Sequence, residues 1–390
     1  MTIGIELTEA QSAIKDAIEK ICSKYDDHYW LKVDETGKFP DAFVDDIAAG
    51  GWLGVAMPES VGGAGLGLTE AALMMQTVAA SGAGFSGASA IHLNIFGLMP
   101  IVKFGTEAQQ QMFLPPAMNG KEKACFAVTE PNSGLDTSSL ETKAERTANG
   151  YRINGRKIWT TNAQRADKIM IIARTTPKDQ AKRPTEGLSL FYADFDRKKI
   201  EAQPIPKMGR KAVECNTLFI EDLEVPKEAL IGEEGAGFKI LLTGLNPERV
   251  LFAAESVGLG RAALRRAAQY AKERVVFGRP IGQNQGIQHP LAERWMALEA
   301  AWTMVMKGAW LYDQHQPCGA EANTAKFLGA RAGQDACMQA VLTHGGFGYA
   351  KEYHVERLLR EVTVTRIAPV TEQLILSFIA EKVLDLPKSY

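Results

Sequence analysis

The sequence predicts an α+β multidomain protein in which a β-barrel or sandwich lies between two helical regions. Apolar residues recur at helical spacing in the first third, short β-branched runs fill the middle, and long helical patterns return afterwards. The expected boundaries are 1–124, 125–233 and 234–390. A chain of 390 residues suits such a composite, because it is too long for one small core.

The first region is predicted to be helical. Ile14, Ile18 and Ile21 fall on one face of a helix, and the alanine-rich stretch 69–80 repeats this spacing. A proline at 58 and a cluster of glycines within 62–67 predict a loop that interrupts the helices.

The middle region carries the signals of strands. Runs rich in β-branched and aromatic residues predict strands at 168–173, 188–192 and 217–220. Asn154-Gly155, which follows Tyr151 to Ile153, predicts a hairpin turn.

The last region is predicted to be a helical bundle, with helices at 261–274, 290–312 and 323–342. No repeat of fixed period and no low-complexity tract interrupts this order. A cleft where three domains meet is a natural cofactor site.

Composition argues against several classes of function. A net charge of −2 without a block of Lys and Arg makes nucleic acid a poor partner. The five scattered cysteines predict free thiols in a reducing compartment, and the six histidines show no metal-ligand spacing. The N-terminus has no basic segment before an apolar run, and no long uncharged apolar run predicts a membrane span, so we expect a soluble, cytoplasmic protein.

The first candidate motif covers residues 126–136, at the passage into the β-region. Gly134 permits close approach of the backbone, and the hydroxyls of Thr129 and Ser133 can donate to a flavin or phosphate oxygen. The same residues also occur in an ordinary turn.

The second candidate motif covers residues 155–162. The indole of Trp159 can lie against a flat heteroaromatic ring, while the hydroxyls of Thr160 and Thr161 can reach the ring edge. A single Trp in a strand more often belongs to a hydrophobic core.

Together the two motifs resemble the middle-domain flavin motifs of the acyl-CoA dehydrogenase family. The resemblance is colinear over nearly the whole chain, and it continues through 208–210, 219–226, 232–238, 273–281 with Gln285, and 345–349. It implies an N-terminal helical domain, a middle β-domain, a C-terminal four-helix bundle and FAD as the cofactor. It also implies a homodimer or homotetramer whose flavin sites are shared between subunits.

Two groups of residues would hold the cofactor by this resemblance. The first group would contact the flavin and its phosphates: Phe126, Val128, Thr129, Gly134, Leu135, Trp159, Thr160 and Thr161, with Thr371 and Gln373 from a loop near the C-terminus. The second group would hold the ADP half of a neighbouring subunit's cofactor: Arg274, Phe277, Gln285, Leu342, Gly345 and Gly346. Leu135 and Leu342 depart from the family, which often has serine and glutamine there. Arg274 is a permanent cation suited to a diphosphate, although it also reads as a solvated helix charge.

The catalytic base is expected in an unusual place. Much of the family carries it in a segment Ile-Tyr-Glu-Gly-Thr, but here Pro369 occupies the glutamate position within 367–371. The isovaleryl-CoA and long-chain branches instead place a glutamate directly before an arginine, which matches Glu248-Arg249. Pro247 could open a helix here, where the dipole would favour a charged Glu248, and by position alone Glu248 would be an ordinary first-turn residue.

Substrate contacts are expected from Leu135, Arg249, Ala368 and Pro369. Arg249 would orient Glu248 or bind the CoA phosphates, and we favour the second role. The thioester carbonyl would be polarised by a flavin hydroxyl and a backbone N–H next to Ala368. Because Pro369 has no N–H, either Val370 donates instead or the loop is rearranged. The small Ala368 allows a branched or medium-chain acyl group.

The resemblance therefore implies oxidation of an acyl-CoA to its 2,3-enoyl-CoA. The α-proton would go to Glu248, the β-hydride to N5 of FAD, and the electrons to an electron-transfer flavoprotein. The alternatives on the same scaffold are an oxidase, a lyase, or a flavin-binding protein without catalysis in the manner of the DNA-binding alkylation-response branch. The near-neutral charge counts against the last.

Overall fold

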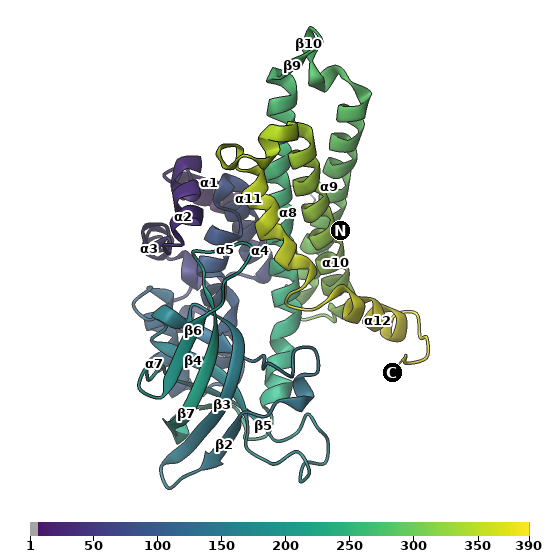
Figure 1. Cartoon of the computed structure of the whole chain (residues 1–390). Coiled ribbons are helices and arrows are strands. Elements are labelled where there is room, and N and C mark those ends of the chain that lie inside the picture. The colour runs from purple at the N-terminus through teal and green to yellow at the C-terminus, as the bar shows by residue number, and fades with distance from the viewer. Residues whose placement is uncertain (1–6, 390) are drawn as a thin grey trace.

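Three regions follow one another along the chain, as predicted, in a computed structural model that describes residues 7–389 (Figure 1). The N-terminal helices surround a core of apolar side chains. They are α1 (Glu9–Cys22), α2 (Asp27–Thr36), α3 (Asp41–Ala49), α4 (Leu68–Val78), η3 (Ala79–Ala83), α5 (Gly84–His92), η4 (Leu93–Gly97), α6 (Met99–Phe104) and α7 (Glu107–Met118). The loop predicted at 58–67 is present and contains the short turn η2 (Glu59–Val61).

The helical stretch Leu68–Phe104 corrects one expectation. By length and composition it could cross a membrane, although no such run was expected from the sequence. However, 72% of its most apolar window is buried inside the protein. Its hydrophobicity is therefore that of a core helix, which packs against α8 (Gly237–Glu273).

The middle region is a single sheet of eight strands. The strands are β1 (Ala124–Ala127), β2 (Lys143–Arg146), β3 (Gly150–Thr161), β4 (Lys168–Arg174), β5 (Leu188–Asp194), β6 (Ile200–Pro204), β7 (Cys215–Pro226) and β8 (Leu230–Ile231). The order is β6-β7-β3-β2-β4-β5-β8, and β1 pairs with β4 in parallel. Ile169 and Ile171 of β4 enter the core within the sheet, whereas Met170 and Ile172 pack toward α7 and α8. Because β4 is buried on both faces, its sequence is almost continuously apolar.

The predicted hairpin at Asn154-Gly155 is wrong. These residues lie inside β3, where the register with β7 shifts between Ile153 and Gly155. The turn between β2 and β3 comes earlier, where Thr147 N–H donates to the carbonyl of Gly150 at 2.9 Å. Asn-Gly serves a β-bulge as well as a tight turn, so the dipeptide alone does not choose between them.

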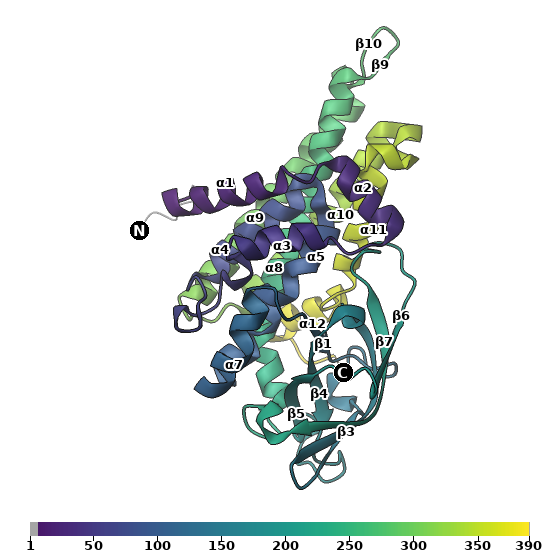
Figure 2. The same ribbon diagram turned by 90° about the vertical axis from the view of Figure 1, so that its left-hand side faces the viewer.

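The C-terminal region is built on three long helices, α8, α9 (Gln285–Asp313) and α10 (Gly319–His344), with α11 (Val355–Val362) packed against α10 and α8. They run side by side in both views (Figures 1 and 2). The smaller elements are β9 (Val275–Val276), β10 (Arg279–Pro280), η9 (Gly345–Tyr349), η11 (Thr363–Arg366) and α12 (Glu372–Lys382).

The expected helix start at Pro247 is also wrong. Pro247 lies inside α8, so Glu248 is about three turns from the amino end of the helix and away from its dipole. The proline lacks one hydrogen-bond donor, but the helix continues because the turns beyond it are buried against α9 and α10. The sequence alone does not distinguish a proline inside a helix from a proline in its first turn.

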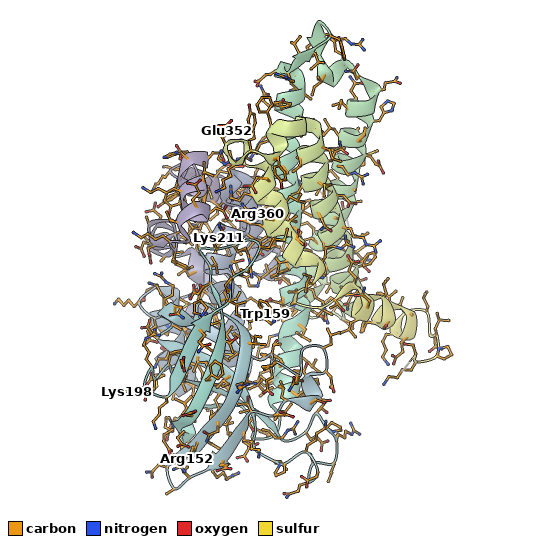
Figure 3. All side chains as sticks on the ribbon, in the orientation of Figure 1. Arg152, Trp159, Lys198, Lys211, Glu352 and Arg360 are labelled. Atoms are coloured by element: carbon orange, nitrogen blue, oxygen red, sulfur yellow. The ribbon has the colours of Figure 1, made fainter. Side chains whose placement is uncertain are left out.

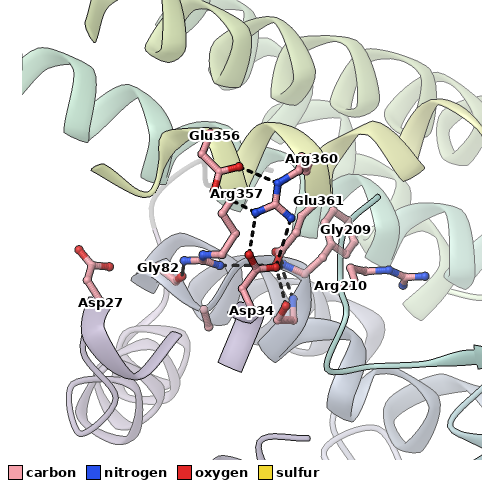
Figure 4. A network of polar contacts seen from close by, with 12 residues as sticks. Asp27, Asp34, Gly82, Gly209, Arg210, Glu356, Arg357, Arg360 and Glu361 are labelled. Atoms are coloured by element: carbon pink, nitrogen blue, oxygen red, sulfur yellow. Dashed lines mark hydrogen bonds and ion pairs between the residues drawn. The ribbon is translucent and has the colours of Figure 1, made fainter. Parts of the chain in front are cut away.

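A buried ion pair on α11 anchors the amino end of α5 (Figure 4). Arg357 and Glu361 are fully buried and lie 3.5 Å apart. Glu361 accepts hydrogen bonds from Phe85 N at 2.7 Å, Ser86 N at 3.2 Å and Ser86 Oγ at 2.6 Å. A carboxylate in this position satisfies the first free N–H groups of α5 and meets its dipole favourably.

We predict that Arg357→Met lowers stability by about 3 kcal/mol or more, because it leaves the Glu361 carboxylate buried without its cation. The midpoint of urea unfolding measures the effect. Lys15→Met removes an exposed pair with Glu19 and should change stability by less than about 0.5 kcal/mol. Equal midpoints for the two variants would contradict the prediction.

Candidate active site

The two sequence motifs lie side by side. Lys157 of β3 donates through Nζ to the carbonyl of Val128 at 3.0 Å and to Oε1 of Glu130 at 2.8 Å. The N–H of Ile158 donates to the carbonyl of Thr129 at 2.8 Å. The segment after β1 is thereby tied to the end of β3 that carries Trp159.

The Lys157–Glu130 pair is almost completely removed from water, with side-chain exposures of 0% and 6%. Burial lowers the pKa of Lys157 to about 8, although Glu130 opposes this shift. Burial also acts to raise the pKa of Glu130, but Lys157 and N–H donors at Glu141 and Thr142 outweigh it and hold that pKa below its usual value. Each charge is thus stabilised mainly by the other.

Trp159 does not belong to a core. Its backbone has a φ of 60°, which is strained for a residue with a bulky side chain, and its side chain is 54% exposed. Figure 3 shows it where the sheet meets the C-terminal helices. Thr161 is half-buried beside it, whereas Thr160 points to the other face of β3 and is buried, with no partner for its hydroxyl among residues 7–389.

The other predicted flavin contacts border the same segment. Phe126 and Val128 are half-buried against the core shared by the sheet and α8. Gly134 has open space where a Cβ would stand, and Leu135 is 60% exposed. These neighbours leave the backbone accessible at the position where close approach was predicted.

The residues predicted to hold the ADP half lie beside β9 and β10 and at the adjoining ends of α9 and α10. Figures 1 and 2 show β9 and β10 at the top of the molecule. The Arg274 guanidinium lies 5.6 Å from the centre of the Phe347 ring, which joins the two predicted segments. Phe277 is fully exposed, Gln285 and Leu342 are exposed, and Gly345 and Gly346 have open space at their Cβ positions. Within one chain this group is far from Trp159.

Glu248 is part of a three-residue polar cluster. Its Oε2 lies 2.9 Å from Nε2 of His92, the last residue of α5, and Nδ1 of His92 lies 2.6 Å from Oε1 of Glu255. Glu255 is fully buried, whereas 24% of the Glu248 side chain remains exposed. The adjoining η4 packs against both β1 and α8, which places this cluster close to the first motif.

His92 and Glu255 were missed in the sequence, although two signals were available. His92 is the only ionisable residue between Glu70 and Lys103, within an otherwise apolar stretch. Glu255 follows Glu248 by seven residues, which is two helical turns and therefore the same face of α8. No signal in the sequence states that the two segments meet.

The loop near the C-terminus lies close to α8, because η11 packs against that helix. Ala368 N–H donates to the carbonyl of Val364 at 2.9 Å, while the N–H of Val370 has no acceptor among residues 7–389. Thr371 caps α12 by accepting from Leu374 N, and Gln373 is exposed.

Arg249 does not orient Glu248. Its Nη1 donates to Oδ1 of Asn246 at 2.8 Å, and in the described part of the chain it forms no hydrogen bond or ion pair with Glu248. Burial lowers the pKa of Arg249, and its Nε has no partner among the described residues.

Comparison with known proteins identifies the family of the chain. Family models for the N-terminal, middle and C-terminal domains of acyl-CoA dehydrogenases match residues 8–121, 125–223 and 235–384. The chain is 34% identical over 98% of both lengths to acyl-CoA dehydrogenase FadE12 of Mycobacterium tuberculosis. It is also 35% identical to CarC, a subunit of the caffeyl-CoA reductase–Etf complex of Acetobacterium woodii, over 88% of this chain and 89% of that protein. The structure of butyryl-CoA dehydrogenase from Megasphaera elsdenii superposes with a TM-score of 0.93 at 30% identity, covering 98% of this chain and all of the other.

The chain belongs to the acyl-CoA dehydrogenase family. The predicted fold class is confirmed, and the protein is an FAD-dependent oxidoreductase. The residues fit this cofactor, because a flavin needs a surface for its flat ring. Trp159 offers a half-exposed indole for it, on a backbone held in a strained conformation.

In this member of the family, Lys157→Met should cost about 3 kcal/mol and release FAD, because it leaves the buried Glu130 carboxylate without its cation and removes the hydrogen bond from Lys157 to the first motif. The urea midpoint and the ratio of bound flavin to protein measure both effects. The matched control is Arg152→Met on the same strand, whose ion pair with Glu224 is half-exposed. A variant with normal stability and full flavin content would contradict the role of the pair.

Proposed function

We propose that the protein oxidises an acyl-CoA thioester to the 2,3-enoyl-CoA and that Glu248 accepts the α-proton. The observation that carries this proposal is the place of Glu248: it is a partly exposed carboxylate, held by His92, on the helix that packs next to the first flavin motif. Pro369 occupies the alternative position of the base and has no proton acceptor. A carboxylate positioned within reach of the substrate is what removal of an α-proton requires.

The chain's own residues would divide the work as follows. Trp159 and Thr161 would hold the flavin ring, and FAD, when bound, accepts the hydride from the β-carbon. The N–H of Val370, which has no acceptor among the described residues, would polarise the thioester carbonyl in place of Pro369. This polarisation would make the α-proton acidic enough for Glu248 to remove. Arg249 would contact the substrate.

The flavin site would be completed by a second subunit. The tip formed by β9 and β10, next to the residues proposed for the ADP half, lies well away from Trp159, which stands where the sheet meets the helices (Figures 1 and 3). This separation supports a site in which one subunit holds the flavin and a neighbour holds the ADP half. The fully exposed Phe277 and the exposed Leu342 favour burial against a neighbour. A homodimer or homotetramer would satisfy both features.

An electron-transfer flavoprotein would take up the electrons. CarC, a relative that matches most of this chain, carries the name of a complex with such a protein, which supports this acceptor. The small Ala368 supports a branched or medium-chain acyl group. The cytoplasmic location stays a prediction.

Glu248→Gln is expected to keep its FAD and to lose reduction by acyl-CoA by about two orders of magnitude or more, because the amide cannot accept the proton. Anaerobic bleaching of the flavin with a panel of acyl-CoAs measures the rate. Glu145→Gln, an exposed glutamate on β2, is the control. Normal bleaching of Glu248→Gln would refute the assignment, and no bleaching of the wild type by any thioester would favour a non-catalytic flavoprotein.

The shared site predicts complementation between two defective subunits. Trp159→Ala and Arg274→Met should each bind FAD poorly alone. In hybrid dimers purified through two different tags, one site carries both defects and the other carries neither, so about half of the sites should bind FAD and react. Hybrids no better than the separate variants would show that each chain builds its own site.

A further inference from the structure

His92 joins two carboxylates of α8 that point to the same side. Glu248 and Glu255 are seven residues apart, which is two turns of the helix. The imidazole fills the space between them, with its two nitrogens 2.9 Å and 2.6 Å from the respective carboxylate oxygens. The ring centroids of His92 and Phe252 lie 5.6 Å apart in a T-shaped arrangement, so Phe252 packs against the imidazole from a third direction.

Both contacts are strongest when the imidazole carries a proton on each nitrogen, because a carboxylate can only accept. Burial disfavours the charged ring, but Glu248 and Glu255 outweigh burial and hold the pKa of His92 well above its usual value. Burial raises the pKa of Glu255, and His92 acts in the opposite direction. Glu255 also feels Arg210, whose guanidinium donates to Oγ of Ser89, one turn before His92 on α5.

We propose that His92 is a positioning residue for the reaction: anchored by the buried Glu255, it holds the Glu248 carboxylate in one conformation before the substrate arrives. This inference rests on the proposed role of Glu248 as the proton acceptor. When the α-carbon–hydrogen bond breaks and an O–H bond forms on Glu248, the proton on His92 stays in place, because Glu255 still carries the opposing charge. His92 therefore need not touch the substrate.

The geometry distinguishes this role from ordinary packing. If His92 only filled space, a fully buried Glu255 beside it would serve no purpose. Burying a carboxylate charge costs free energy unless a partner compensates it. The second oxygen of Glu255 has no partner among the described residues, so the charge of Glu255 is directed largely at His92. Glu248, on the other side of His92, keeps 24% of its side chain exposed.

The test uses the FAD-loaded protein and four variants: Glu248→Gln, His92→Gln, Glu255→Gln, and His28→Gln as an exposed histidine control on α2. We expect His92→Gln and Glu255→Gln to keep FAD and to bind acyl-CoA with little change in Kd. The rate of flavin reduction should fall about tenfold to a hundredfold, because the base is no longer held in place. The wild-type rate should fall at high pH, where His92 loses its proton, and this alkaline limb should be absent in His92→Gln, because glutamine does not titrate.

The outcomes separate the two proposals. Loss of reduction in Glu248→Gln together with a wild-type rate and pH profile in His92→Gln would overturn the positioning role alone. Normal reduction in Glu248→Gln would overturn the proposed base itself. A slower His92→Gln that keeps the alkaline limb of the wild type would show a purely structural role, and a large rise in Kd would show substrate recognition. Either result refutes the proposal.

A measurement on the wild type covers variants that fail to fold. In a protein labelled with ¹⁵N-histidine, one of the six imidazoles should stay doubly protonated above about pH 8, where a free histidine is neutral. A spectrum in which every imidazole has lost its proton below that pH would overturn the proposal.

Discussion

The placement of α5 is the constraint on which the candidate active site depends. At its amino end, Glu361 receives the free N–H groups of Phe85 and Ser86, and at its carboxyl end His92 reaches α8. Gly84 must be glycine, because a Cβ there would collide with the Glu361 carboxylate, and its φ of 60° suits no larger residue well. A helix of the N-terminal region is thus held at both ends by the C-terminal bundle.

A second buried pair does the same for the sheet. Lys157 and Glu130 join the segment after β1 to β3, so that Trp159 projects where the sheet meets the helices (Figure 3). Each pair is costly unless both partners are present, and for this reason each selects one arrangement of its segments. Since η4 packs against both β1 and α8, the two ion pairs help to set the position of the first motif relative to Glu248.

The sequence predicted the order of the regions, the positions of β4, β5 and β7 and parts of several helices, because periodicity is local information. The errors at Asn154-Gly155 and Pro247 share one cause, because each pattern is compatible with two local structures. Pairing with β7 favours a bulge over a turn at Asn154-Gly155, and packing of α8 in the bundle favours a continuous helix over a helix start at Pro247. The role of Glu248 was inferred from a resemblance and from Pro369. His92 and Glu255 could not be joined in advance, because their meeting depends on how α5 is packed against α8.

In the proposed function the base stands on a helix instead of in a loop, and this changes what the protein must supply. A glutamate at position 369 would lie in the short loop before α12, and the backbone of that loop would set the direction of its side chain. Glu248 stands on a helix whose backbone is fixed, so only its own side-chain rotations aim the carboxylate, and freezing them costs entropy. This entropy cost is offset when a charged hydrogen-bond donor already lies within hydrogen-bonding distance of the carboxylate. His92 is such a donor, because Glu248 and Glu255 together hold its pKa well above its usual value although burial opposes them.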